Sequence, residues 1–113
     1  MDCLFCKIIK REIPADIVYE DDHVLAFNDV NPKAPVHQLV IPKKHIATLN
    51  DIEETDLALV GRLQLTAAKL AHEQGFAEDG YRVVMNCNEM GGQTVYHIHM
   101  HLMGGRAFTW PAG

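Results

Sequence analysis

Short apolar runs, separated by polar residues that favour turns, dominate the first part of the chain and predict strands. Residues 17–20 and 24–27 flank a pair of aspartates, as the two strands of a hairpin flank their turn. A third strand is expected over residues 37–41. Pro42 should end it, because proline lacks the N–H group that a central ladder requires.

A helical repeat occupies the middle of the chain, from Ile52 to Gln74. Apolar residues recur there every three or four positions, and Gly75 follows as a natural stop. The opposite side of this helix carries charged residues and is expected to face solvent. A short helix is predicted over residues 6–11, ahead of Pro14.

Two more apolar runs, over residues 81–86 and 94–103, complete the predicted set of strands. These elements, with one long and one short helix, indicate an α+β protein built on a five-stranded antiparallel sheet. With 113 residues and 48% hydrophobic content, the chain is expected to form a single domain over residues 1–113.

The chain is acidic, with a formal net charge of -5 at pH 7. Polynucleotides and anionic membranes bind basic surfaces, so neither is an expected partner. No apolar run approaches the roughly 20 residues that span a bilayer, and the first residues lack a signal-peptide pattern. Its three cysteines do not form the framework of a secreted disulfide protein. We therefore expect a cytoplasmic location.

Histidines occupy every second position in one stretch, at His97, His99 and His101, and alternate with apolar residues from Ile98 to Leu102. Successive side chains of an extended backbone point to opposite faces, so the imidazoles should share one face, roughly 7 Å apart. Near neutral pH histidine serves as a nucleophile, a proton carrier or a metal ligand. On this stretch alone, a metal-binding or merely solvated strand face is the alternative.

Three segments resemble the signature of the histidine triad superfamily, in order and in spacing. They are Asp29 to Pro32, Pro35 to His45, and Gly91 to Arg106. The resemblance covers essentially the whole chain. Gly104-Gly105-Arg106, followed by Trp110-Pro111, is similar to the branch of histidine triad nucleotide-binding proteins, which are purine nucleoside phosphoramidases.

This resemblance implies a hydrolase of the histidine triad fold that binds purine nucleotides such as AMP or GMP. It would cleave purine nucleoside 5′-phosphoramidates or acyl-adenylates to the nucleoside monophosphate. By the same resemblance, His99 is the nucleophile and forms a covalent nucleotidyl-histidine, which water hydrolyses. His37 and His101 are expected to bind phosphoryl oxygens, and His97 to fix the ring and tautomer of His99. The chemistry requires no cofactor.

The resemblance also assigns roles to residues around the histidines. Thr94, where serine is often found, is expected to assist the leaving group, Gln93 to orient water or the leaving group, and Asn86 to bind phosphate. Asp29 matches an acid that accepts from both ribose hydroxyls, and a turn cap before Pro32 is its alternative. The residues that match the walls of a purine slot are Leu4, Phe5, Ile8, Phe27 and Val30. Ordinary core packing is the alternative for these five.

Cys3 and Cys6 form a Cys-x-x-Cys pair of the kind that can chelate Zn²⁺. Some members of the superfamily bind zinc through such a pair, a histidine after the Pro-Lys-Lys segment and the first histidine of the triad. Here those histidines are His45 and His97. The resemblance thus implies a structural zinc site at these four residues, and free thiols are the alternative.

Three other functions remain open from the sequence. A dinucleoside polyphosphate hydrolase of the same superfamily would use the same histidines with a nucleotide as the leaving group. A non-enzymatic adaptor would sense purine nucleotides, and a metal-binding protein would hold an ion at His99 and His101. The resemblance also implies a homodimer joined through residues 80–87 and the long helix, since pairing covers an exposed sheet edge.

Overall fold

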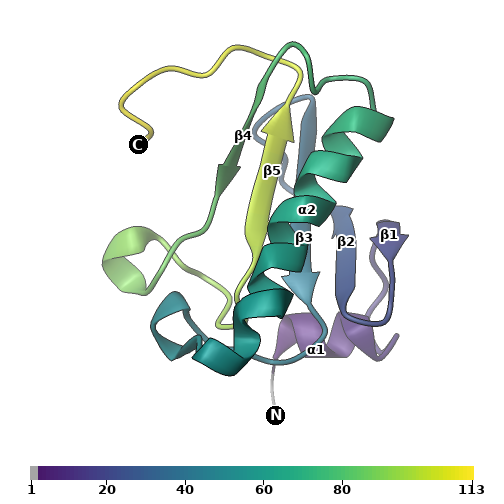
Figure 1. Cartoon of the computed structure of the whole chain (residues 1–113), viewed down its shortest axis with the longest axis vertical. Helices are drawn as coiled ribbons and strands as arrows, with labels where there is room; N and C mark the ends of the chain where they lie inside the picture. The colour runs from purple at the N-terminus through teal and green to yellow at the C-terminus, as the bar shows by residue number, and fades with distance from the viewer. Residues whose placement is uncertain (1–2) are drawn as a thin grey trace.

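Five strands form one antiparallel sheet in which the fifth strand of the chain lies between the third and the fourth (Figure 1). The computed structural model describes residues 3–113. The strands are β1 (Ile17–Glu20), β2 (Val24–Asn28), β3 (Val36–Pro42), β4 (Tyr81–Val84) and β5 (Met100–Gly104). The helices are α1 (Leu4–Ile9) and α2 (Leu57–Glu73), with 3₁₀ turns η1 (Leu49–Asp51), η2 (Glu54–Asp56) and η3 (Glu89–Gly91). The predicted α+β class and five-stranded antiparallel sheet are confirmed.

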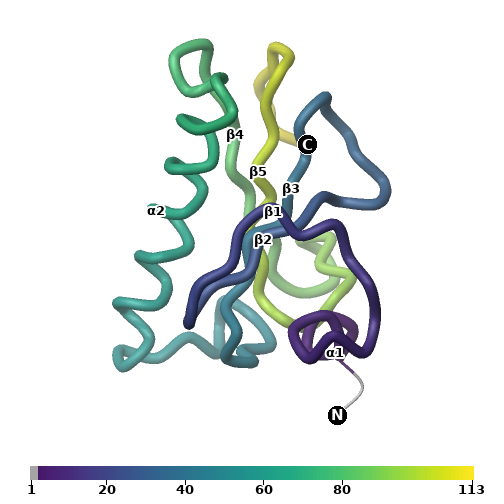
Figure 2. Tube along the Cα trace, turned by 90° about the vertical axis from the view of Figure 1, so that its right-hand side faces the viewer, coloured from purple at the N-terminus to yellow at the C-terminus, as the bar shows by residue number. Residues whose placement is uncertain are grey.

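Alternation along the central strands gives the sheet two apolar faces. On β2, Val24 and Ala26 belong to the layer under α2, whereas Leu25 and Phe27 belong to the layer under α1. Figure 2 shows the two helices on opposite sides of the sheet. Because successive side chains point to opposite faces, a single strand supplies both layers of the core.

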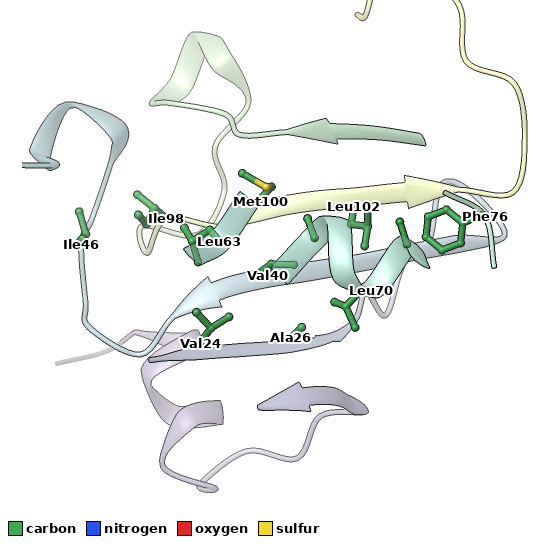
Figure 3. Packing of buried hydrophobic residues seen from close by; sticks show 12 residues of the cluster. Val24, Ala26, Val40, Ile46, Leu63, Leu70, Phe76, Ile98, Met100 and Leu102 are labelled. Carbon is green, nitrogen blue, oxygen red and sulfur yellow. The ribbon is translucent and has the colours of Figure 1, made fainter. Parts of the chain in front are cut away.

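The helix α2 packs its apolar stripe on one face of the sheet (Figure 3). Leu63, Ala67 and Leu70 are buried there with Val40 and Leu102 of the strands. Burial of each large apolar side chain contributes about 1.5–3 kcal/mol, so this layer holds the helix firmly on the sheet. No helix within residues 3–113 has the length and apolar character to cross a bilayer.

The short helix α1 covers part of the opposite face. Phe5 and Ile8 pack in one cluster with Phe27 and Leu39 of the sheet. The rings of Phe5 and Phe27 meet edge to face, with centroids 5.4 Å apart. This cluster contains fewer buried residues than the one under α2.

The helix α1 begins and ends two residues earlier than predicted, at Leu4–Ile9 instead of residues 6–11. The Sγ atom of Cys3 accepts the N–H group of Cys6 at 3.3 Å and caps the first turn. This cap fixes the start of the helix, because it satisfies an N–H group that has no partner inside the helix.

The helix α2 begins at Leu57 rather than at Ile52. The preceding residues form η1 and η2 instead, each held by an aspartate. Asp51 Oδ2 accepts the N–H of Thr48 at 3.1 Å, and Asp56 Oδ2 accepts the N–H of Glu53 at 3.0 Å. These side-chain bonds keep the backbone in two separate turns, so helical spacing alone overestimates the helix.

The last strand is shorter than predicted, because β5 begins at Met100 and residues 94–99 lie outside the ladder. The N–H group of Ile98 donates to the carbonyl oxygen of Ile46 at 2.8 Å and is therefore not paired with β3. The strand β4 also ends early, at Val84. Ile98 and Met100 nevertheless lie in the layer under α2, so the predicted placement of the apolar residues between the histidines is confirmed.

Candidate active site

His99 is held with one ring nitrogen free. Its Nδ1 atom lies 2.8 Å from the carbonyl oxygen of His97. A carbonyl can only accept, so Nδ1 carries the proton of the neutral ring and Nε2 keeps its lone pair. The ring of Phe5 meets His99 edge to face, with centroids 5.1 Å apart, and restricts its rotation. His99 therefore offers an oriented nucleophilic nitrogen.

A second chain of hydrogen bonds orients His101. The backbone N–H of Lys33 donates to His37 Nδ1 at 2.9 Å, which leaves the proton of the neutral His37 ring on Nε2. His37 Nε2 lies 2.9 Å from His101 Nδ1 and donates to it. The proton of the neutral His101 ring is thus on Nε2, where it is available to an oxygen atom of a ligand.

Burial keeps the imidazole rings of His37 and His101 neutral near pH 7. Burial, followed by the neighbouring His99 and His37, lowers the pKa of His101 to about 4. Burial also lowers the pKa of His37, although the carboxylate of Asp29 acts in the opposite direction. Neutral rings have defined tautomers, so His101 is a hydrogen-bond donor without carrying a charge.

The rings of His99 and His101 lie next to each other, with centroids 5.1 Å apart. This is closer than the roughly 7 Å expected between same-face positions of a strand. Side chains lean along the strand direction, which brings neighbouring rings together. A single ligand group can therefore meet the lone pair of His99 and the N–H of His101 at the same time.

Both histidines line a cavity of about 590 Å³, which we call the nucleotide cavity after the ligand that the sequence resemblance leads us to expect. The predicted site residues that line it are Leu4, Phe5, Ile8, Phe27, Asp29, Val30, Thr94, His99 and His101. The lining combines apolar side chains with a few polar groups, as small-molecule sites do. The apolar residues from α1 and β2 thus serve the core and the cavity wall together.

Several residues that the sequence did not indicate also line the nucleotide cavity. They are Ile13, Pro14, Ala15, Asp16, Asn28, Leu39 and Val95. Leu39 lies two positions after His37 on β3, so the period of a strand is a signal that could have found it. The segment before β1 carries no such signal and reaches the cavity only through the fold.

Asp29 uses its two carboxylate oxygens differently. Oδ1 accepts the N–H of Asn31 at 2.8 Å, which is the turn cap considered as the alternative for this residue. Oδ2 lies 3.4 Å from His37 Nε2. Because Asp29 also lines the nucleotide cavity, the turn cap holds the carboxylate in place beside a ligand.

Gln93 does not line the nucleotide cavity. It is buried, its Nε2 atom donates to the carbonyl oxygens of Ala47 at 2.8 Å and Val95 at 3.1 Å, and its Oε1 atom accepts the N–H of Asn88 at 2.8 Å. These three bonds commit the side chain to the backbone of neighbouring loops. Gln93 therefore holds neighbouring loops together and has no contact with the cavity.

Three other predicted residues also lie outside the cavity wall. His37 lies behind His101 and acts on it through the hydrogen bond described above. His97 acts on His99 through its carbonyl oxygen, while its own ring belongs to a separate cluster. Asn86 follows β4 and is not part of the wall.

The cluster that contains the His97 ring consists of Cys3, Cys6, His45 and His97. One ligand atom of each residue lies within 4.8 Å of those of the others. The Nδ1 atom of His97 is 3.4 Å from Cys3 Sγ, 3.6 Å from Cys6 Sγ and 3.2 Å from His45 Nδ1. Neighbouring ligands of a tetrahedral zinc ion with two sulfur and two nitrogen ligands lie about 3.3–3.8 Å apart. The spacing of the four side chains fits such an ion.

The protonation of His97 also fits a metal ligand. Its Nε2 atom lies 2.7 Å from the carbonyl oxygen of Pro42 and donates to it, so the lone pair of Nδ1 faces the cluster. Burial lowers the pKa of His97 to about 4, which keeps the ring neutral, as a ligand must be. Cys87, the third cysteine, lies outside this cluster.

Residues 10–108 match the HIT domain family. The chain belongs to this family. The chain is 56% identical over 105 residues to the purine nucleoside phosphoramidase of Escherichia coli strain K12, and the matched residues cover 93% of the chain and 88% of that relative. The resemblance to the histidine triad superfamily is thereby confirmed.

Solved HIT structures share its fold over almost the entire chain. A HIT family hydrolase from Legionella pneumophila Philadelphia 1 has a TM-score of 0.98 at 56% identity, and the match covers 99% of this chain and 100% of that one. A histidine triad protein from Clostridium difficile has a TM-score of 0.93 at 50% identity, with 96% and 95% covered. The predicted HIT-like fold is confirmed.

Proposed function

We propose that this HIT domain is a hydrolase that cleaves purine nucleoside 5′-phosphoramidates, or the related acyl-adenylates, to the nucleoside monophosphate. The observation that carries the proposal is the pair of adjacent imidazoles in the cavity wall, His99 with a free lone pair and His101 with a free N–H. A nucleophile beside a hydrogen-bond donor suits transfer of a phosphoryl group, whose oxygens carry charge. The relative from Escherichia coli that is 56% identical is named a purine nucleoside phosphoramidase.

The size and lining of the nucleotide cavity support a purine nucleoside monophosphate as the bound group. A volume of about 590 Å³ lies in the range of sites for ligands of this size. Phe5, Ile8 and Phe27 offer apolar and aromatic faces to a base. The carboxylate of Asp29 is an acceptor for ribose hydroxyls, which are donors.

In the first step, the nucleotidyl group is transferred to His99. The Nε2 lone pair forms a bond to phosphorus, the phosphorus–nitrogen bond of the substrate breaks, and its electron pair leaves with the amine. The amine nitrogen takes a proton from the Thr94 hydroxyl, which recovers one from solvent. His101 donates a hydrogen bond to a phosphoryl oxygen, and His37 holds the His101 ring in the required tautomer.

In the second step, water hydrolyses the covalent intermediate. Its oxygen attacks phosphorus, the bond from phosphorus to His99 Nε2 breaks, and the ring recovers its lone pair. The water releases a proton to solvent and the nucleoside monophosphate departs. The carbonyl oxygen of His97, 2.8 Å from His99 Nδ1, stabilises the positive charge that the ring carries between the two steps.

A comparison of three substrate classes tests the proposed function. We expect kcat/KM for adenosine 5′-phosphoramidate and for an acyl-adenylate to exceed that for a dinucleoside tetraphosphate by about tenfold or more. Mass spectrometry of the rapidly quenched protein should reveal an AMP adduct. A preference for the tetraphosphate would make the chain a polyphosphate hydrolase, and AMP binding without turnover would make it a nucleotide-sensing adaptor.

We also propose that Cys3, Cys6, His45 and His97 hold a structural Zn²⁺ ion. The spacing of their ligand atoms and the neutral ring of His97 support this site. Four protein ligands leave no open position on zinc, so the ion would join segments of the chain and take no part in cleavage. The segments are α1, the loop after β3 and the residues before β5.

A two-fold homodimer through α2 and β4 is part of the proposal. Leu57 and Leu65 of α2 are 72% and 71% exposed, and Tyr81 and Val83 of β4 are exposed as well. The strand β4 lies at the edge of the sheet, where its unpaired backbone groups can continue the ladder into a second copy. Exposed leucines on α2, together with the open edge at β4, support pairing of two sheets and two helices.

A further inference from the structure

The loop of residues 29–35 joins β2 to β3 and supplies the hydrogen bond that fixes the tautomer of His37. None of the side chains of residues 30–35 is buried, so core packing does not hold this loop in place. Its first half is held by Asp29, whose Oδ1 atom accepts the N–H of Asn31. Its second half carries Lys33, whose N–H donates to His37 Nδ1, and requires a separate anchor.

Arg106 follows β5 and anchors the second half of the loop. Its Nε atom donates to the carbonyl oxygen of Lys33 at 3.1 Å. The guanidinium group is itself fixed, because it also donates to the carbonyl oxygen of Ala107 at 3.0 Å and lies over the Phe108 ring, 4.2 Å from its centroid. The planar group thus ties the chain after β5 to the backbone beside His37.

Gly105 brings Arg106 close enough to the loop for this bond. A Cβ atom on Gly105 would lie 2.8 Å from Pro35 Cβ, nearer than two such atoms can pack, and the φ angle of Gly105 is +90°. Glycine allows both the close approach and this backbone conformation. The chain after β5 therefore lies directly against the loop.

The Lys33 N–H decides the tautomers of two rings. While it donates to His37 Nδ1, His37 Nε2 donates to His101 Nδ1, and the proton of His101 is on Nε2. Without that N–H, the His37 proton can occupy Nδ1. His37 Nε2 then accepts from His101 Nδ1, and His101 Nε2 has a lone pair in place of its proton. Asp29 Oδ2 favours the first arrangement, but its 3.4 Å distance from His37 Nε2 is long for a hydrogen bond.

We infer that Arg106 is a positioning residue for the cleavage reaction, because it holds the loop that sets the tautomers of His37 and His101. The inference rests on the proposed function, in which His101 donates to a phosphoryl oxygen. Arg106 does not line the nucleotide cavity, so it acts through Lys33 and the two rings. The donor of His101 faces charge that is greatest in the transition state, so its loss should lower kcat more than it weakens AMP binding.

Arg106→Ala tests the inference, because it removes the bond to the loop. Complete loss of one such donor lowers kcat about 10²–10³-fold, so a partial change of tautomer should lower kcat for adenosine 5′-phosphoramidate about tenfold. The Kd for AMP should rise less than about threefold. NMR of isotope-labelled histidine rings should place the protons of His37 and His101 on Nε2 in the unmodified protein and partly on Nδ1 in the variant. Arg106→Lys keeps a charged donor and should recover part of both effects.

Arg82→Ala is the matched control. Arg82 also lies over the Phe108 ring, 5.2 Å from its centroid, and donates to the carbonyl oxygen of Thr109 at 2.8 Å. Among the described residues, no hydrogen bond joins Arg82 to the loop, so kcat and both tautomers should be unchanged in this variant.

Two results would overturn the inference while the proposed function stands. One is a lower kcat in Arg106→Ala with both ring protons still on Nε2, and the other is the same loss in Arg82→Ala. If the unmodified protein does not cleave the substrate, the proposed function is wrong. The ring spectra remain informative in that case, because unchanged tautomers in Arg106→Ala would overturn the role of Arg106 as well.

Discussion

Backbone groups decide which nitrogen of each histidine is free. The carbonyl oxygen of His97 accepts from His99, that of Pro42 accepts from the His97 ring, and the N–H of Lys33 donates to His37. A backbone carbonyl or N–H cannot change its role, so each neutral ring has one tautomer. In the proposed function, these tautomers let the same residue type serve as a nucleophile at His99, as a metal ligand at His97 and as a hydrogen-bond relay at His37.

Replacement of His99 by alanine removes the nucleophile and keeps the binding groups. Turnover of adenosine 5′-phosphoramidate should fall by about 10³-fold or more, while the Kd for AMP should change by less than about threefold. Steady-state kinetics and calorimetry measure the two effects. His72→Ala, at an exposed position in the last turn of α2, is the control and should keep full activity. Near-normal turnover in His99→Ala would assign the nucleophile to another residue.

Acid should destabilise the protein through His101. Its pKa is about 4 in the folded chain and about 6.5 in an unfolded one, so the unfolded state binds the extra proton between these values. The contribution of the ring to stability is therefore present above about pH 6.5 and lost as the pH falls to about 4. The groups that act on this ring are His99, His37 and Asp29.

The variant His101→Asn, which cannot titrate, measures this contribution. Because the ring is partly exposed, solvent screening reduces it to the order of 1 kcal/mol. Urea unfolding gives the free energy of unfolding of both proteins at about pH 7 and about pH 4.5. Between these two pH values, this free energy should fall by about 1 kcal/mol more in the unmodified protein than in the variant. Equal losses in the two proteins would exclude His101 as a source of the acid sensitivity.

A pair of glutamines ties the helix α2 to the sheet. Gln38 of β3 and Gln74, directly after α2, exchange two side-chain hydrogen bonds of 2.8 Å. Gln38 also donates to Asn28 Oδ1 of β2 at 3.2 Å. No buried side-chain nitrogen or oxygen within residues 3–113 lacks a partner. The polar pair is thus fully satisfied, although Gln38 itself is buried.

Gln74→Ala should destabilise the protein, because it leaves the buried amide of Gln38 without its main partner. We expect a loss of about 1–3 kcal/mol in the free energy of unfolding. Gln64→Ala, which changes the same residue type at an exposed position of α2, should stay within about 0.5 kcal/mol. Urea unfolding of the three proteins compares them, and equal stability of the two variants would show that the pair contributes nothing.

The proposed zinc site joins elements that are far apart in the chain. Elemental analysis of protein purified without a metal-affinity tag should find about one zinc ion per chain, and Cys6→Ser should lose it. Loss of the ion should lower the free energy of unfolding by at least about 2 kcal/mol and leave the chemical step intact. Cys87→Ser, outside the cluster, is the control and should retain zinc. A metal-free and fully stable protein would favour free thiols.

For the whole molecule, the proposed dimer predicts a mass near twice the 12.7 kDa of one chain by light scattering at micromolar concentration. Leu65→Glu places a charge on the exposed face of α2 and should produce monomers, since unpaired charges are not tolerated inside an apolar interface. Leu49→Glu changes a leucine that is exposed in η1, outside the two proposed interface elements, and should leave the dimer intact. A monomer in the unmodified protein would contradict the dimer.

Local periodicity is sufficient to predict much of this molecule. The alternation around the histidines assigns Ile98 and Met100 to the core, because side-chain direction on an extended backbone depends only on position. The helical spacing likewise predicts the buried stripe of α2. Element boundaries are less predictable, since a side chain such as that of Asp56 forms a cap that competes with helical spacing.

Contacts between residues far apart in the sequence decide the features of the site that periodicity does not predict. The acceptor for the His97 ring is the carbonyl of Pro42, and the bonds from Gln93 to Ala47 remove a predicted side chain from the cavity wall. Asp16 reaches the nucleotide cavity although nothing in its neighbourhood along the chain indicates a site. A repeating pattern records the direction of side chains within one element, whereas tautomers, cavity walls and ligand clusters depend on how several elements pack against one another.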